Sequence, residues 1–281
     1  MPNKPAHSVP QAWPRDWLVP QWPAPAKVRA VMTTCSGGTS AGLFSSMNLG
    51  EHVGDDPAAV AANRAKLAEL AAARPVFMRQ VHGAAVAHVD ASSQALQADG
   101  ALTLEPGLAC TVMVADCLPV LLTHERVPVV AALHAGWRGL AGQGGPGFDG
   151  VVESGWAELQ AATGLSGQDL SAGLLAWLGP CIGPEVFEVG GEVRAAFVAA
   201  QPEAHVCFKP TANGKYLADL PQLARLRLQR LGIHRFFGND GSRAWCTVSE
   251  SAFFSHRRVS GRPGALAGDT GGRMAACIWL D

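Results

Sequence analysis

The sequence has little charge and no excess of either sign. Charged residues make up 16% of the 281 residues, and 22 basic side chains are matched by 23 acidic ones, for a formal net charge of −1. A chain with this balance has no overall electrostatic attraction for nucleic acid, so any anion-binding site must be local.

The sequence also lacks a long uninterrupted hydrophobic run. The uncharged stretch Leu170–Pro184 is broken by glycines and prolines and falls short of the roughly 20 residues that a membrane span needs. The first 25 residues hold seven prolines and no apolar core segment, which argues against a secretory signal. Trp13, Trp17 and Trp22 instead predict that residues 1–27 form an arm that packs on the following domain.

The cysteines show no disulfide pattern. There are seven of them, an odd number, scattered and mostly within apolar runs. This usage is typical of buried thiols in a reducing compartment, and it predicts a cytoplasmic protein.

The remaining chain, residues 28–281, shows no internal repeat or long linker and is interpreted as one domain. Helices are expected at 57–73, where Asp56 and Pro57 form a start signal, after Asp149, and after Asp219. The Gly-rich stretch 139–147 lacks the lysine of a phosphate loop and is interpreted as an ordinary loop. Strands are expected, often in closely spaced pairs, at 75–81, 84–89, 110–115, 118–123, 127–133, 174–178 and 275–280. The prediction is an α+β fold of layered mixed or antiparallel sheets flanked by helices.

Three segments place metal-binding side chains where strands open into loops: 79–83 with His82, 115–119 with Cys117, and 133–139 with His134. A hairpin centred between Glu125 and Arg126 would put Cys117 directly opposite His134, about 4.5–5.5 Å apart at Cβ, close enough to share one zinc ion. A slip in the hairpin register would change this pairing.

His82 would have to reach this pair from elsewhere in the fold. The long, irregular spacing of the three residues differs from the tight ligand pairs of a structural zinc finger. Three protein ligands leave a fourth position for water, as in catalytic zinc sites, and the site would keep a charge of about +1 to acidify that water.

Several motifs follow one another between about Thr34 and Leu280. They are SSMNLG at 45–50, RQVHG at 79–83, ADG at 98–100, ADCLP at 115–119, HAGWRG at 134–139, LGPCIGP at 178–184, FSHRR at 254–258, GRMA at 272–275 and IWL at 278–280. With these motifs the chain resembles the YfiH-type family, which carries a laccase-like, multicopper polyphenol oxidase label and is described as zinc-dependent purine nucleoside phosphorylases.

The resemblance implies that His82, Cys117 and His134 bind zinc and take part in catalysis, and that Asn48 and Arg257 lie near the substrate. It implies phosphorolysis of adenosine, inosine, guanosine and methylthioadenosine, and deamination of adenosine. Two departures stand out: Phe187 replaces a usual tyrosine, and the segment 270–273 carries one extra glycine before its arginine.

Phosphorolysis requires groups that hold phosphate, and guanidinium groups suit it because of their planar fork of donors. Four arginines within the matched motifs are therefore candidates: Arg79, Arg138, Arg257 and Arg273. Deamination needs a carboxylate that carries protons, and Asp116 and Asp99 are candidates.

Two other interpretations stay open. Cys117 as nucleophile with His134 as base would make a hydrolase, for example of a peptidoglycan precursor. A non-catalytic metal- or nucleotide-binding module would bind its ligand without turnover. One cysteine and two histidines cannot hold the four coppers of a laccase.

Overall fold

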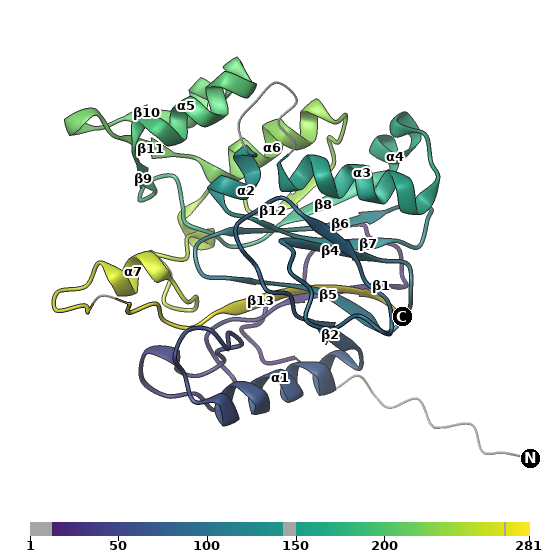
Figure 1. The fold of residues 1–281 in the computed structure, drawn as a ribbon, viewed down its shortest axis with the longest axis horizontal. Coiled ribbons are helices and arrows are strands. Elements are labelled where there is room, and N and C mark those ends of the chain that lie inside the picture. The colour runs from purple at the N-terminus through teal and green to yellow at the C-terminus, as the bar shows by residue number, and fades with distance from the viewer. Residues whose placement is uncertain (1–12, 143–149, 267) are drawn as a thin grey trace, which may run out of the picture.

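Two β-sheets lie face to face in the computed structural model, and helices cover their outer surfaces (Figure 1). The structure describes residues 13–142, 150–266 and 268–281. The order of layers is helix α1, a four-stranded sheet, a six-stranded sheet, and a group of helices that includes α3, α4 and α6. The layered α+β fold predicted from the sequence is confirmed.

The four-stranded sheet has alternate side chains in two different cores. Along its central strand β5, Cys110 and Val112 face the other sheet, whereas Ala109 and Met113 face α1, as the period of two along a strand requires. The strand order and bounds are β1 (Val28–Met32), β13 (Met274–Leu280), β5 (Leu108–Val114) and β2 (Arg74–Val76), with α1 at Pro57–Ala71.

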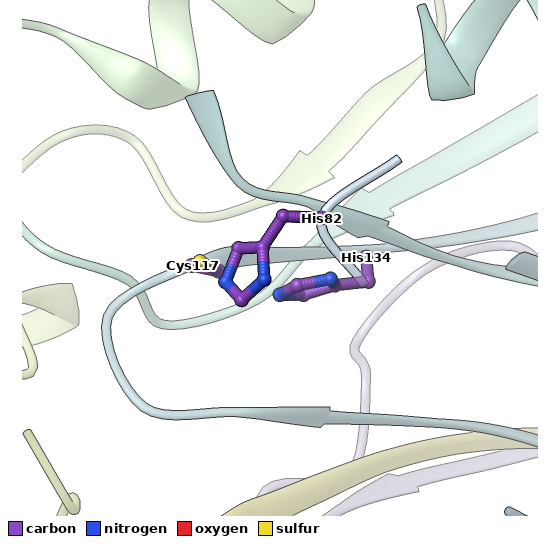
Figure 2. Close-up of side chains that lie close together, drawn as sticks. All are labelled: His82, Cys117 and His134. Carbon is purple, nitrogen blue, oxygen red and sulfur yellow. The ribbon is translucent and has the colours of Figure 1, made fainter. Parts of the chain in front are cut away.

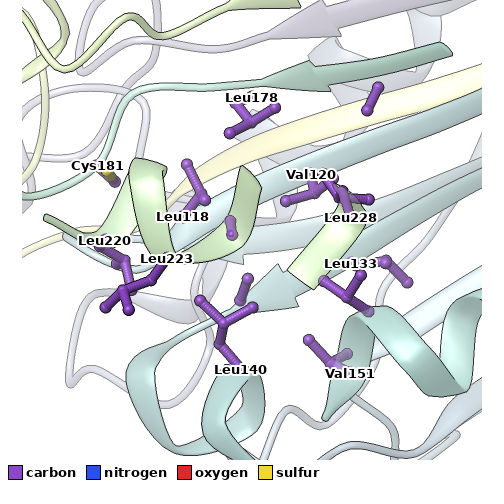
Figure 3. Close-up of a cluster of buried hydrophobic side chains, with 14 of the residues drawn as sticks. Leu118, Val120, Leu133, Leu140, Val151, Leu178, Cys181, Leu220, Leu223 and Leu228 are labelled. Atoms are coloured by element: carbon purple, nitrogen blue, oxygen red, sulfur yellow. The ribbon is translucent and has the colours of Figure 1, made fainter. Parts of the chain in front are cut away.

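The six-stranded sheet forms the centre of the molecule. Its outer face packs on α3 and α6 through a cluster that includes Leu118, Val120 and Leu133 from the sheet and Leu223 and Leu228 from α6 (Figure 3). Its inner face meets the four-stranded sheet. The order and bounds are β12 (Phe236–Gly238), β8 (Leu174–Leu178), β6 (Leu118–His124), β7 (Val130–Ala135), β4 (Gly100–Thr103) and β3 (Val86–His88).

A third, small sheet lies beside α5 in Figure 1 and has the order β10-β11-β9. Its strands are β10 (Phe208–Pro210), β11 (Tyr216–Ala218) and β9 (Glu188–Val189). The other helices are α2 (Trp137–Ala141), α3 (Val151–Thr163), α4 (Gly167–Gly173), α5 (Gly191–Ala200), α6 (Leu220–Arg230) and α7 (His256–Ser260). Short 3-10 helices are η1 (Gly42–Phe44), η2 (Pro202–Cys207), η3 (Ala212–Gly214) and η4 (Arg243–Trp245). None of the helices that the structure describes is both long and apolar enough to cross a membrane.

The expected helices are present with shifted ends. Asp56 caps α1 by accepting the N–H of Ala58, and Asp219 caps α6 by accepting that of Gln222. Helix α1 ends two residues earlier than expected, because Ala72 adopts a left-handed conformation. Asp149 and the Gly-rich residues 143–147 lie outside the described residues.

The strand expected at 75–81 is shorter, because the chain leaves the sheet after Val76. From there the side chain of Gln80, rather than a backbone, pairs with the edge of β5: its amide N–H donates to the Met113 carbonyl at 2.8 Å and its carbonyl accepts the Met113 N–H at 2.7 Å.

The β6–β7 hairpin has a register that differs by two residues from the expected one, which was wrong: Pro119, not Cys117, lies opposite His134. Val127 does not begin the second strand, since Pro128 has no N–H to pair and the Nδ1 atom of His124 accepts the N–H groups of Arg126 and Val127 within the turn. A slip of two residues keeps each side chain on its face, so Cys117 and His134 still share one side of the hairpin.

The described part of the N-terminal arm, from Trp13 onward, packs on the sheets. Trp17 is buried, Trp13 stacks on it at 5.7 Å between ring centroids, and Trp13 also meets Trp279 of β13 edge-on at 6.3 Å. The boundary at residue 27 stays a prediction. All seven cysteines are free thiols, and five of them are buried.

Candidate active site

His82, Cys117 and His134 form one cluster at the rim of the layer between the two large sheets (Figure 2). Their candidate ligand atoms all lie within 4.8 Å of one another, and the two imidazole rings meet edge-on, with centroids 4.8 Å apart and planes inclined by 74°. The fold therefore brings the side chains of His82, Cys117 and His134 together, as the sequence predicted.

His134 belongs to β7, and its ring is held from behind by a buried carboxylate. The Nδ1 atom lies 2.9 Å from Oδ1 of Asp99, which is fully buried. A hydrogen bond at Nδ1 fixes the ring and leaves Nε2 available for Cys117 or a metal. Asp99 was a candidate proton carrier, but the structure places it behind the imidazole and outside the cavity lining, where it orients His134.

The same carboxylate also holds the loop that carries His82. Asp99 accepts the backbone N–H groups of Val81, His82 and Gly83, at 3.2, 2.9 and 2.7 Å. One buried side chain thus organises two of the three members of the cluster.

Two residues of the site adopt backbone conformations that non-glycine residues rarely take. His82 has φ of +59° and Asp116, next to Cys117, has φ of +90°. Such conformations cost of order 1–3 kcal/mol and persist where the surroundings impose them, often at functional sites. At Asp116 the carboxylate is fixed by the Thr247 hydroxyl at 2.6 Å and by the Arg257 backbone N–H at 2.7 Å.

Gly136, which lies between β7 and α2, is required by close packing at the cluster. A Cβ atom at this position would lie 2.9 Å from the Cys117 sulfur and 3.2 Å from Cδ2 of His82. A larger residue here would push against the side chains of Cys117 and His82.

The cluster favours a thiolate. Burial by itself would raise the pKa of the Cys117 thiol, but the facing imidazoles of His134 and His82 outweigh it and lower that pKa to about 6. Burial would likewise lower the pKa of His134, but Cys117 and Asp99 outweigh it and raise it to about 9. A thiolate and two imidazoles at this spacing suit a divalent cation, which would replace the proton that balances the sulfur charge.

The cluster opens into a cavity of about 480 Å³, a volume suited to a small-molecule ligand. Its walls combine aromatic and apolar side chains with arginines: the ring of Phe187, the indole of Trp137, and the guanidinium groups of Arg138, Arg257 and Arg273. The other lining residues are His52, Gln80, Met113, Ala115, Asp116, Ile182, Leu220, His256 and Ser260, together with the cluster itself.

Of the residues expected near the substrate, Asp116 and Arg257 line this cavity, as do Arg138 and Arg273. The extra glycine before Arg273 therefore does not remove its side chain from the site. Gly271 takes φ of +64°, a conformation that favours glycine.

Asn48 and Arg79 do not line the cavity. Asn48 is buried, and its side-chain oxygen accepts the backbone N–H of Arg273 at 2.8 Å, so it fixes the segment that carries an arginine of the site. Arg79 is exposed and lines a neighbouring hollow, which shares His52, Gln80 and Met113 with the cavity.

Sequence reasoning missed several members of the wall. Trp137 and Gln80 stand inside the motifs that drew attention to His134 and His82, so their positions were available. His256 likewise stands inside the motif that supplied Arg257, whereas His52 and Ser260 carried no distinguishing local signal and are brought to the cavity only by the fold.

Residues 29–281 match the family model described as multi-copper polyphenol oxidoreductase laccase. The chain belongs to this family, the YfiH family. Two relatives carry the name purine nucleoside phosphorylase. One, from Pseudomonas aeruginosa, is 47% identical over 266 residues, covering 94% of this chain and 98% of the relative. The other, YfiH from Escherichia coli, is 43% identical over 267 residues, covering 94% and 98%.

Solved structures of YfiH-family proteins agree with the fold. The crystal structure of the Neisseria meningitidis protein NMB0706 superposes with a TM-score of 0.80 at 39% identity, covering 95% of this chain and 100% of that one. YlmD from Geobacillus stearothermophilus gives a TM-score of 0.78 at 32% identity, covering 91% and 92%.

The multi-copper part of the family description has no counterpart in the described residues. Within ranges 13–142, 150–266 and 268–281, a single group of three or more His, Cys, Asp or Glu side chains is close enough to share a metal ion. One three-residue group offers a site for one metal, whereas a laccase holds four coppers.

Proposed function

We propose that this YfiH-family chain is a zinc-dependent purine nucleoside phosphorylase. The observation that carries the proposal is the His82–Cys117–His134 cluster, which opens into a cavity sized for a nucleoside, in a chain 40–47% identical to bacterial proteins named purine nucleoside phosphorylase. The substrates would be a purine nucleoside (adenosine, inosine, guanosine or methylthioadenosine) and phosphate.

His82, Cys117 and His134 would hold the zinc ion. When bound by three protein ligands, zinc keeps a position for water or substrate and polarises the group that occupies it. Two histidines and one cysteine also bind copper in electron-transfer sites. Metal analysis of the purified protein separates the two metals.

The reaction forms a bond between a phosphate oxygen and C1′ of the ribose while the bond from C1′ to N9 of the purine breaks. The electron pair of that bond leaves with the purine, which takes up a proton. The ring of Phe187, with Arg257 5.9 Å above it, and the indole of Trp137 offer flat surfaces for the purine. Phe187 lacks the hydroxyl of a tyrosine, so it would position the base by packing alone.

Within the part of the chain that the structure describes, Asp116 is the one carboxylate that lines the cavity. One of its oxygens accepts the Thr247 hydroxyl and the other the Arg257 backbone N–H, and a carboxylate oxygen that accepts one hydrogen bond has a second lone pair for a substrate proton. We assign to Asp116 the transfer of protons, to the leaving purine in phosphorolysis and between water and ammonia in the deamination of adenosine.

The test is incubation of zinc-loaded protein with adenosine, with and without phosphate. Phosphorolysis should yield adenine and ribose 1-phosphate only when phosphate is present, and deamination should yield inosine in both cases. Cys117→Ala should abolish both products. If the native protein formed none of these products, like Cys117→Ala, the proposal would be refuted.

A second candidate function, a thiol hydrolase, is supported by the way three side chains follow one another in space. Cys117, His134 and Asp99 stand as nucleophile, base and orienting carboxylate would in a thiol hydrolase. A peptidoglycan precursor would then be a substrate. Activity that survives removal of all metal would favour this candidate, whereas tight nucleoside binding without turnover would indicate a non-catalytic module.

A further inference from the structure

The cavity carries positive charge that the protein itself does not neutralise. Among the described residues that line it, three arginines, Arg138, Arg257 and Arg273, stand against one carboxylate, Asp116, and the Cys117 thiolate. None of the three takes part in an ion pair among the described residues. A cavity lined by one sign of charge attracts and concentrates the opposite sign.

Each guanidinium group is held in place by neutral contacts. That of Arg138 lies 4.4 Å over the ring of Trp137, and that of Arg257 lies 5.9 Å over Phe187. Nη1 of Arg273 donates to the carbonyls of residues 270, 271 and 272, at 3.1–3.2 Å. Stacking on a ring occupies the face of the guanidinium plane and leaves the N–H donors at its edge available to a ligand.

The three groups differ in how many donors remain. Arg257 gives one donor to the Glu188 carbonyl at 3.3 Å, and Arg273 uses Nη1 as described. Arg138 makes no side-chain hydrogen bond within the described residues, although its neighbour Trp137 keeps it on the cavity wall. It is the arginine of the cavity with the most unused donor capacity.

We propose that Arg138, together with Arg257 and Arg273, forms the subsite for inorganic phosphate. The inference rests on the proposed function, because the nucleoside is uncharged and only the phosphate co-substrate needs several guanidinium donors. Arg79, a fourth arginine of the matched motifs, is excluded because it lines the neighbouring hollow. A tetrahedral oxyanion with several acceptor oxygens suits forked donors that line one cavity from separate elements.

The experiment compares Arg138→Gln, Arg138→Lys and a control, Arg126→Gln. Arg126 is an exposed arginine of the β6–β7 turn, outside the cavity. Arg138→Gln should raise the KM for phosphate about 10- to 100-fold, the range for a lost charge-assisted hydrogen bond, and change the KM for adenosine less than about threefold. The KM for phosphate of Arg138→Lys should lie between those of Arg138→Gln and the native protein. Arg126→Gln should have the native KM values for phosphate and adenosine.

Deamination needs no phosphate, so Arg138→Gln should lose much less of its deamination rate than of its phosphorolysis rate at a fixed phosphate concentration, whereas Arg126→Gln, outside the cavity, should keep both native rates. An equal rise in both KM values, or a matching loss of deamination, would show a general defect of the cavity and would overturn the proposal.

Calorimetric titration with inorganic phosphate keeps the subsite separate from the proposed function. Phosphate binding by the native protein that Arg138→Gln weakens at least tenfold would support the subsite even if no nucleoside were cleaved. Equal phosphate binding by the two proteins, or none by the native protein, would contradict it.

Discussion

His134 and His82 reach the same cluster from two different kinds of structure. His134 is 3% exposed, lies in a central strand and has its ring fixed by Asp99, whereas His82 is exposed and comes from a loop with a left-handed backbone. Both positions depend on Asp99, which holds the ring of one and the backbone of the other. The comparison separates a preformed half of the site, Cys117 with His134, from a half that the loop completes.

Loss of each histidine tests this division most severely. His134→Ala should remove metal binding altogether, since it takes a ligand from the preformed half, and activity should fall to the background rate. His82→Ala should weaken metal binding by more than the roughly 10- to 100-fold that losing an outer partner costs, yet leave weak binding by Cys117 and His134. The measurement is metal content and affinity by competition with a chromophoric chelator. Equal affinities in the two variants would contradict the division.

Substitution of Asp99, whose carboxylate links both halves of the site, should have the next largest effect on metal affinity. Asp99→Asn keeps the shape but loses the charge behind His134 and weakens the acceptor for three loop N–H groups, so metal affinity should fall about 10- to 100-fold. Asp240→Asn is the control, because Asp240 is an exposed residue that caps its own turn by accepting the N–H of Ser242. Unchanged affinity in Asp99→Asn would show that Asp99 supports only the fold.

A larger side chain at Gly136, where the two halves of the site meet, should reduce metal affinity less than loss of Asp99. Gly136→Ala places a methyl group 2.9 Å from the Cys117 sulfur and 3.2 Å from the His82 ring, so we expect the His82 loop to shift away from the added methyl group. We expect metal affinity to fall several-fold and the free energy of unfolding to fall by about 1–3 kcal/mol. Gly191→Ala at the start of α5 is the control, since a Cβ there meets no atom within 4 Å. Chemical denaturation measures the free energy of unfolding, and metal competition measures the affinity. If Gly136→Ala bound metal as tightly as Gly191→Ala, the added methyl group would not crowd the cluster.

The sequence supports prediction of the preformed half better than of the loop half. Cys117 directly precedes β6 and His134 lies in β7 of the same hairpin, and the prediction that they share a face held despite the register error because the slip was an even number of residues. No strand pattern predicts the position of His82, because it depends on hydrogen bonds to Asp99, 17 residues away in sequence. Local pattern says nothing about such a contact.

The expected substrate residues show the same limit. Arg257 faces the cavity, but Asn48 serves the backbone of Arg273, 225 residues away, and only the fold reveals that role. Arg79 lies one residue from Gln80, and Gln80 rather than Arg79 lines the cavity. A motif identifies the segment that contributes to a site, whereas the direction of each side chain depends on where the chain leaves the sheet.

Removal of the metal should have the smallest effect on the fold, because the cores on both faces of the six-stranded sheet are built without the cluster. Ligand binding at 100 to 1,000 times the dissociation constant stabilises by roughly 3–4 kcal/mol, so chelation should lower the Tm by about 5–15 °C while unfolding stays cooperative. His82→Ala should already melt near the chelated value, lose little more with chelator, and regain little with zinc. Complete unfolding of the chelated native protein, as in a zinc finger, would mean that the metal holds the sheets together and that neither half of the site is preformed.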